Sequence, residues 1–232
     1  MRLVCRLAFA LAIAAGVTPA KAALFVNSDA LGFSFVVDYA GKVNGATTNL
    51  IGGVGSVTYT GLSDGGRTYN FNYTMKNDSS VASRLTSWGF NVVNAAAEAD
   101  KSTGFFGSAN LNNNFPEGVG NIEVCFEADA NGNCTGGSGG LIMNQTGLGT
   151  FSVTFANAMA SLTLADFTAR FQSINPTING SSSGVGIGSV VATNGVPVSA
   201  PEPTSWLLML AGFGLIGRAL RRPGVVAEFQ NA

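Results

Sequence analysis

Residues 69–75 read Tyr69-Asn70-Phe71-Asn72-Tyr73-Thr74-Met75, with apolar and polar side chains in strict alternation. Successive side chains of a β-strand point to opposite faces, so this alternation predicts a strand with one buried and one exposed face. Similar strand patterns dominate the rest of the central chain. The stretch therefore places the protein in the all-β class.

Residues 57–60 repeat the alternation, and a glycine-rich turn separates them from residues 69–75. We interpret the pair as a β-hairpin. A one-residue slip between the strands would expose a whole apolar set, so the pairing must place apolar residues opposite one another. A three-residue loop over residues 64–66, with a glycine at positive φ, meets this condition. It places Tyr59 opposite Phe71 and Val57 opposite Tyr73.

Further strands are predicted over Phe33–Tyr39, Thr86–Val93, Ile122–Ala128, Phe151–Phe155 and Phe167–Ile174. Apolar spacing over residues 162–174 fits a helix or a strand, and we favour the strand. The alanine-rich residues 94–101 predict a short helix. Many short strands joined by Gly and Asn turns indicate a β-sandwich or jelly-roll-like domain over residues 23–180. Residues 181–200, rich in Gly and Ser, are predicted to be a linker.

The chain contains no histidine, which excludes Ser-His-Asp and Cys-His nucleophilic sites and histidine-containing zinc sites. Between residues 23 and 200 there are six basic and eleven acidic side chains. That balance is too acidic for a nucleic-acid-binding protein. We therefore expect no enzyme activity, no metal, no cofactor and no nucleic-acid partner.

Two cysteines, Cys125 and Cys134, lie in the central region. In an exported protein they are expected to form a disulfide, because oxidised cysteine pairs persist outside the cytoplasm. The intervening Asp129–Asn133 resembles a calcium loop only superficially. The positions at which an EF-hand requires Gly and Glu are occupied here by Cys134 and Gly140. We interpret this segment as a turn.

Two further sets of side chains are candidate sites. Glu123 and Glu127 lie four residues apart on one face of a predicted strand, about 13 Å apart, which is too wide for a glycosidase pair. A solvated strand face is the preferred interpretation. Trp88, Tyr39 and Tyr59 are candidates for stacking against sugar rings, since aromatic rings combine apolar faces with polar edges. Core packing is the competing interpretation for all three.

The N-terminus has the pattern of a secretory signal peptide. Arg2 and Arg6 precede an apolar run from Leu7 to Val17, and Ala20-Lys21-Ala22 follows as a small-x-small cleavage site. The apolar run is too short to span a bilayer stably. We predict a signal peptide over residues 1–22 and cleavage after Ala22.

The C-terminal region has three parts: a proline-flanked tripeptide, an apolar run and a basic cluster. Pro201-Glu202-Pro203 fixes an extended backbone, and the following run from Trp206 to Leu220 carries one charge, Arg218. As a helix it spans about 22 Å, short for a bilayer core of about 30 Å. Trp206 at one interface and the arginines at the other would help it span. We predict a transmembrane helix with Arg218, Arg221 and Arg222 on the cytoplasmic side.

This segment resembles the PEP-CTERM sorting signal of exported bacterial proteins. The residues that carry the resemblance are Pro201, Glu202, Pro203, Trp206, Gly212, Phe213, Gly214, Arg218, Arg221 and Arg222. The resemblance covers residues 201–222. It implies recognition by a membrane-embedded exosortase, cleavage near Pro-Glu-Pro, and transfer to the cell surface or an exopolysaccharide matrix. Members of the family usually end after the basic cluster, whereas this chain continues as a predicted cytoplasmic extension over residues 223–232.

The central domain also resembles the cistern family of PEP-CTERM proteins. The resemblance rests on the cysteine pair, the stretch 171–174 and the glycine-rich stretch 183–186. It implies no established activity. We expect an exported protein with a structural or adhesive role in an extracellular matrix or biofilm, anchored at first by its C-terminal helix. The alternatives are a surface carbohydrate-binding module in contact with exopolysaccharide and, more remotely, a carboxylate-based hydrolase.

Overall fold

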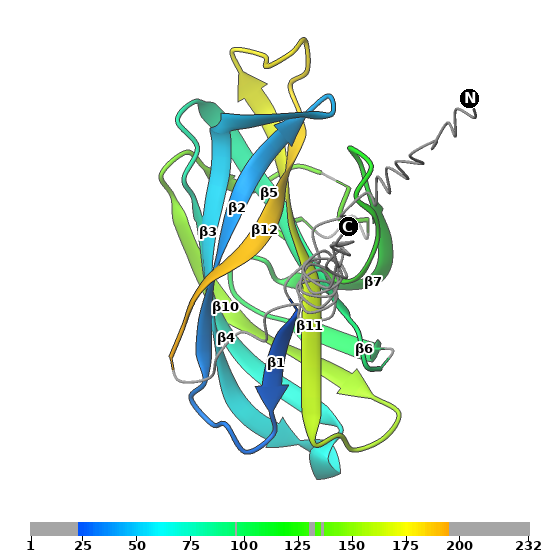
Figure 1. Ribbon diagram of the computed structural model, residues 1–232. Helices are drawn as coiled ribbons and strands as arrows, with labels where there is room; N and C mark the ends of the chain where they lie inside the picture. Colours follow the sequence, from blue (N-terminus) through cyan, green and yellow to red (C-terminus); the bar gives the residue numbers. More distant parts are fainter. Residues whose placement is uncertain (1–22, 96, 130–132, 136, 195–232) are drawn as a thin grey trace, which may run out of the picture.

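The computed structural model describes residues 23–95, 97–129, 133–135 and 137–194. Apart from the single-turn 3-10 helix η1 (Asp64–Gly66), all regular elements in these residues are strands (Figure 1). The all-β prediction is therefore confirmed. The strands are β1 (Leu24–Asn27), β2 (Ser34–Val43), β3 (Ala46–Ser63), β4 (Thr68–Asn77), β5 (Ala82–Val92), β6 (Ala97–Ser102), β7 (Ser108–Phe115), β8 (Gly120–Glu127), β9 (Leu141–Ile142), β10 (Thr146–Phe155), β11 (Ser161–Asn175) and β12 (Gly184–Thr193).

The described strands form one antiparallel sheet in the order β6-β10-β4-β3-β2-β12-β11-β5-β8-β7, with β1 added to β11 and β9 added to β5. The sheet is open, with β6 and β7 at its edges. The predicted sandwich or jelly roll consists of two separate sheets, whereas the described strands form one continuous hydrogen-bonded sheet. The reason is β12, which pairs with β11 on one side and with β2 on the other, so that hydrogen bonding runs without a break.

The hairpin between β3 and β4 has the predicted cross-strand pairs, Tyr59 opposite Phe71 and Val57 opposite Tyr73. Its turn is longer than predicted. Ser63 pairs with Thr68, so four residues connect the strands, and Gly65 there has a φ of 64°. One extra residue in β3, between Tyr59 and Gly61, forms a β-bulge that offsets the longer turn. The bulge restores the register that keeps the aromatic rings buried.

Two other segments test the predicted secondary structure. The ambiguous segment after residue 161 is the strand β11, as favoured. The predicted helix over residues 94–101 is wrong, because this region contributes β6, which pairs with β10. Alanine favours helix only weakly, and pairing with a neighbouring strand overrides that preference.

The predicted linker from residue 181 is also wrong, because β12 lies within it. Its glycines are required for close packing. A Cβ atom at Gly184 would lie 2.7 Å from the Lys42 carbonyl oxygen, and one at Gly188 would lie 2.6 Å from the Phe167 Cβ. Residues 195–200, the rest of the predicted linker, lie outside the described residues.

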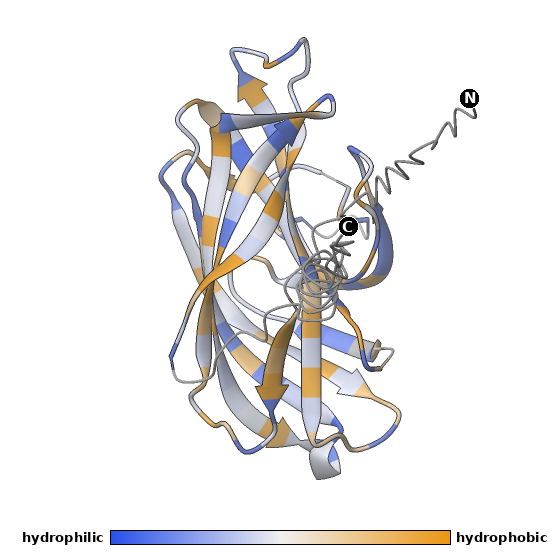
Figure 2. Cartoon of the chain, in the orientation of Figure 1, coloured by the Kyte–Doolittle hydropathy of each residue, from blue (hydrophilic) through white to orange (hydrophobic). Residues whose placement is uncertain are grey.

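The core lies against the inner face of the sheet and is largely aromatic. Polar and apolar residues alternate along the strands (Figure 2), so each strand sends alternate side chains inward. The rings of Phe71 and Phe151 stack with centroids 4.7 Å apart, and those of Trp88 and Phe126 lie 4.8 Å apart. Among the residues that the structure describes, none forms a helix with the length and apolar character needed to span a bilayer.

Candidate functional site

The predicted signal peptide, its cleavage residues Ala20 and Ala22, and every residue of the predicted sorting segment lie outside the described residues. The structure does place the point from which the C-terminal segment leaves. The backbone N–H of Asn194 donates to the Ser34 carbonyl at 3.0 Å, and its Nδ2 donates to the Gly32 carbonyl at 3.1 Å. The last described residue is thus held against the loop between β1 and β2.

The three residues proposed for sugar stacking are buried in the core. Trp88 and Tyr59 have no exposed surface and Tyr39 has 2%. Tyr59 donates its hydroxyl to the Ser28 carbonyl at 3.0 Å, and burial raises the pKa of Tyr39. A ring without an accessible face cannot stack on a sugar, so this prediction is wrong for the folded domain. The competing interpretation, core packing, is the one observed.

The Cys125–Cys134 disulfide is present, with Cα atoms 6.4 Å apart, as the sequence predicted. Both cysteines are buried and, with Phe115 and Ile122, form a small apolar cluster separate from the main core. The disulfide holds the segment after β8 over polar groups of β5 and β11. Ser87 Oγ donates to the Cys134 carbonyl at 2.6 Å, and Arg170 Nε donates to the Thr135 carbonyl at 2.8 Å.

Arg170 is a buried cation that the sequence analysis did not single out. Its Nη1 donates to the Gly184 carbonyl at 2.9 Å, so the guanidinium ties the disulfide segment to β12. Burial lowers its pKa, and the negative charge of Glu117 acts in the opposite direction. The sequence pattern does not reveal this position. Its neighbours Ala169 and Phe171 point to the main core, so alternation along the strand predicts an exposed side chain between them.

Glu123 and Glu127 do not form the solvated face that the sequence predicted. Glu127 is 2% exposed and accepts a hydrogen bond from Asn110 Nδ2 at 2.8 Å. Glu123 accepts hydrogen bonds from the backbone N–H groups of Val92 and Ala97, and so links β8 to the end of β5 and to β6. Both carboxylates hold the fold together. Neither is arranged with the other as a catalytic pair.

A hollow of about 720 Å³ lies beside β2 and β3. It exists because Ala40 and Gly52 are small and because β3 carries a bulge relative to β2 between the pairs Gly41–Thr48 and Ala40–Gly52. Its polar lining includes Asp38, Asp78, Thr47, Thr48 and Asn49. Hydroxyl, amide and carboxylate groups of this kind can hydrogen-bond a ligand rich in hydroxyl groups.

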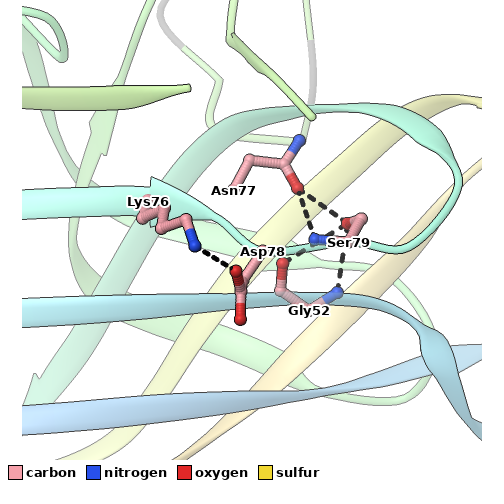
Figure 3. Close-up of polar contacts among 5 residues, drawn as sticks. All are labelled: Gly52, Lys76, Asn77, Asp78 and Ser79. Atoms are coloured by element: carbon pink, nitrogen blue, oxygen red, sulfur yellow. Dashed lines mark hydrogen bonds and ion pairs between the residues drawn. The ribbon is translucent and has the colours of Figure 1, made fainter. Parts of the chain in front are cut away.

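A buried asparagine, Asn77, holds the backbone beside Gly52 and Asp78, two residues that line this hollow (Figure 3). Asn77 has no exposed surface, and its Nδ2 donates to the carbonyls of Ser83, at 3.2 Å, and Leu141, at 2.8 Å. Its Oδ1 accepts from the Ser79 hydroxyl at 2.7 Å, and Ser79 Oγ in turn accepts from the Gly52 N–H at 3.1 Å. The exposed Asp78 beside it is ion-paired with Lys76. Asn77 therefore fixes the turn that presents Asp78.

A second hollow, about 370 Å³, lies over β3, β4, β10 and the end of β6. Its polar lining is Thr60, Asn70, Asn72, Lys101, Ser102, Thr103, Thr150 and Ser152. Seven of these eight side chains are neutral hydroxyls or amides. The surface is suited to hydrogen bonding with a neutral polar ligand, and the two aromatic residues that line it, Phe71 and Phe151, are only 1% and 3% exposed.

Asp100 on the edge strand β6 is a carboxylate in an unfavourable position. It lies opposite Val153, and its Oδ2 is buried without a hydrogen-bond partner among the described residues. Burial raises its pKa from 3.8 to about 6, a shift that a hydrogen bond from its own backbone N–H partly offsets. Inward-pointing charges on edge strands are a known device against edge-to-edge association.

We expect the Asp100→Asn variant to be more stable than the native protein at pH 8 by about 1–2 kcal/mol, a figure discounted for partial exposure. Because the folded state raises this pKa, it favours the protonated form, and stability falls as pH rises from about 4 to about 6. The difference between the two proteins should vanish at pH 4. Denaturant titrations at both pH values measure it, with the exposed Asp38→Asn as control. A pH-independent difference would contradict the assignment.

No three His, Cys, Asp or Glu side chains of the described residues come together to hold a metal ion. In comparison with known protein families, residues 199–222 match the PEP-CTERM protein-sorting motif. No curated protein and no solved structure matches the chain. The motif implies that the protein is exported and is processed and anchored at its C-terminus by an exosortase.

Proposed function

We propose that this exosortase substrate is a non-enzymatic component of the cell surface or extracellular matrix, with a structural or adhesive role in an exopolysaccharide layer. The observation that carries the proposal is the sorting motif at residues 199–222. A disulfide-linked β-domain suits an oxidising location outside the cytoplasm. The proposed sequence of events is export, temporary anchoring by the C-terminal helix, cleavage, and delivery to the surface. Membership of the cistern family is part of the proposal and adds no activity to it.

The second candidate function is a carbohydrate-binding module. It is favoured by the two hollows lined with hydroxyl and amide groups. Recognition there would depend on hydrogen bonds, because the rings of Trp88, Tyr39 and Tyr59 are buried. A neutral polysaccharide is the ligand class that these groups fit.

Processing is tested by the mass of the mature C-terminus in a host that encodes an exosortase. We expect the native protein to lack the residues that follow Pro-Glu-Pro. The combined variant Pro201→Ala, Glu202→Ala, Pro203→Ala should retain Ala232 and stay with the membrane. Glu228→Ala, in the extension beyond the motif, is the matched control and should be processed normally. Released native protein that still ends at Ala232 would overturn the proposal.

A further inference from the structure

We propose that one end of the β-domain, the end from which the C-terminal segment leaves, rests on the lipid bilayer while the protein is anchored. This end, the exit end, consists of the β1–β2 loop, the β3–β4 turn and the C-terminal end of strand β12. The inference rests on the proposed function in one respect, that the sorting segment anchors the chain in the membrane. It adds the orientation of the domain and the surface that contacts lipid.

The first step is the fixed exit point. Asn194 is held by hydrogen bonds to Gly32 and Ser34, so the chain leaves the domain at the β1–β2 loop. Residues 195–205 separate it from Trp206, the first residue of the apolar run. Eleven extended residues reach at most about 36–40 Å. The long strand β3 has 18 residues, which corresponds to about 60 Å. The tether is therefore shorter than the domain, and the exit end stays close to the membrane.

The second step is the apolar surface around this exit point. Leu31 is 72% exposed and directly precedes Gly32, to which Asn194 is bonded. Val191, 60% exposed, lies three residues before Asn194. Phe25 is half-exposed and lines a hollow of about 320 Å³ with Ala30 and Phe33. Large apolar side chains exposed around one point favour a lipid interface, into which each can insert separately.

Charge at the exit end is compatible with this contact. Arg67 and Asp64 in the β3–β4 turn form an ion pair with each other, and Asp29 of the adjoining loop has no ion-pair partner among the described residues. Individually weak apolar contacts suffice here, because the tether keeps their local concentration at the membrane high. A free domain without the tether would bind lipid poorly by the same argument.

The opposite end of the molecule carries the β2–β3 turn and the β11–β12 loop (Figure 1). There the β2–β3 turn, the β7–β8 turn and the β11–β12 loop are joined by polar contacts. Asn44 Nδ2 donates to the Asn179 carbonyl at 2.8 Å, and the Gly45 N–H donates to Glu117 Oε2 at 2.8 Å. This polar end would point away from the bilayer, toward the surrounding matrix.

The experiment uses the exported chain with its sorting segment intact, reconstituted into phosphatidylethanolamine–phosphatidylglycerol vesicles that contain nitroxide-labelled lipid. A fluorophore is attached at Asn27→Cys, near the exit end, or at Ser182→Cys, on the opposite end; both positions are exposed. We expect at least threefold stronger quenching at the first position. Leu31→Asp combined with Val191→Asp should reduce it to the level of the second while the chain stays with the vesicles.

The matched control is Ile142→Asp. Ile142 is 58% exposed but pairs with Arg84 near the start of strand β5, away from the exit end. It should leave the quenching unchanged. Equal quenching at both labels, or quenching that survives the two aspartates, would overturn the proposal. Loss of the chain from the vesicles would remove the anchoring premise itself. A failure of exosortase cleavage alone would alter the mass of the C-terminus and leave the quenching pattern intact.

Discussion

The Asn77→Asp variant is expected to lose about 4 kcal/mol of unfolding free energy at pH 8. The change preserves the shape of the side chain and replaces the amide nitrogen with an oxygen. That oxygen would face the carbonyl oxygens of Ser83 and Leu141 at hydrogen-bond distance, with no solvent access. Repulsion and desolvation together disfavour the charged form. Denaturant titration followed by near-ultraviolet circular dichroism measures the loss.

The pH dependence of this variant gives a further check. The buried environment raises the pKa of the introduced carboxyl, so the protonated form is favoured in the folded state. The destabilisation should therefore be smaller at pH 4 than at pH 8. Asn72→Asp is the matched control, since Asn72 lies exposed on the same strand, and it should change stability by less than about 0.5 kcal/mol. If both substitutions had equal effects, the anchoring role of Asn77 would be refuted.

Removal of the disulfide by combining Cys125→Ser with Cys134→Ser should lower the unfolding free energy by about 3 kcal/mol. Opening a ten-residue loop restores conformational freedom to the unfolded chain. In the folded state the freed segment is also more mobile. The carbonyls in it that accept hydrogen bonds from Ser87 and Arg170 are then held less firmly. The variant should therefore expose the Arg170 guanidinium more often. Its denaturation midpoint is compared with that of the native protein.

The control for this prediction is chemical reduction. A reducing agent should lower the midpoint of the native protein to that of the double-serine variant and leave the variant unchanged. A variant as stable as the oxidised native protein would mean that the surrounding packing, and not the covalent link, holds this segment.

The sequence predicted the strands well where one face is buried and the other exposed. The pairing of Tyr59 with Phe71 follows from the need to bury both rings, and that need holds whatever the turn length. The turn itself was not predictable, because a four-residue connection with a bulge and a three-residue connection without one bury the same side chains. Local alternation therefore determines register better than it determines loops.

The remaining errors have a common physical origin in long-range pairing. β6 pairs with the distant β10, and β12 pairs with the distant β2 as well as with its neighbour β11, while their Ala- or Gly-rich composition carries little periodic signal. The same limit applies to the candidate sites. Composition identified aromatic residues that are able to stack on sugars, but burial depends on which face each strand presents. The disulfide was predictable because it needs only two cysteines and an oxidising compartment.

The pairing of the first strands with the last has a consequence for how the protein is made. β1 pairs with β11 and β2 pairs with β12, in both cases through residues more than 130 positions apart in the chain. During export the N-terminal strands cross first and must wait until almost the whole domain has been translocated before their partners arrive. Folding then proceeds slowly, as expected for such a high contact order. Because the sorting motif at residues 199–222 follows β12 in the chain, the last strands pair when the C-terminal anchor is already close to the membrane.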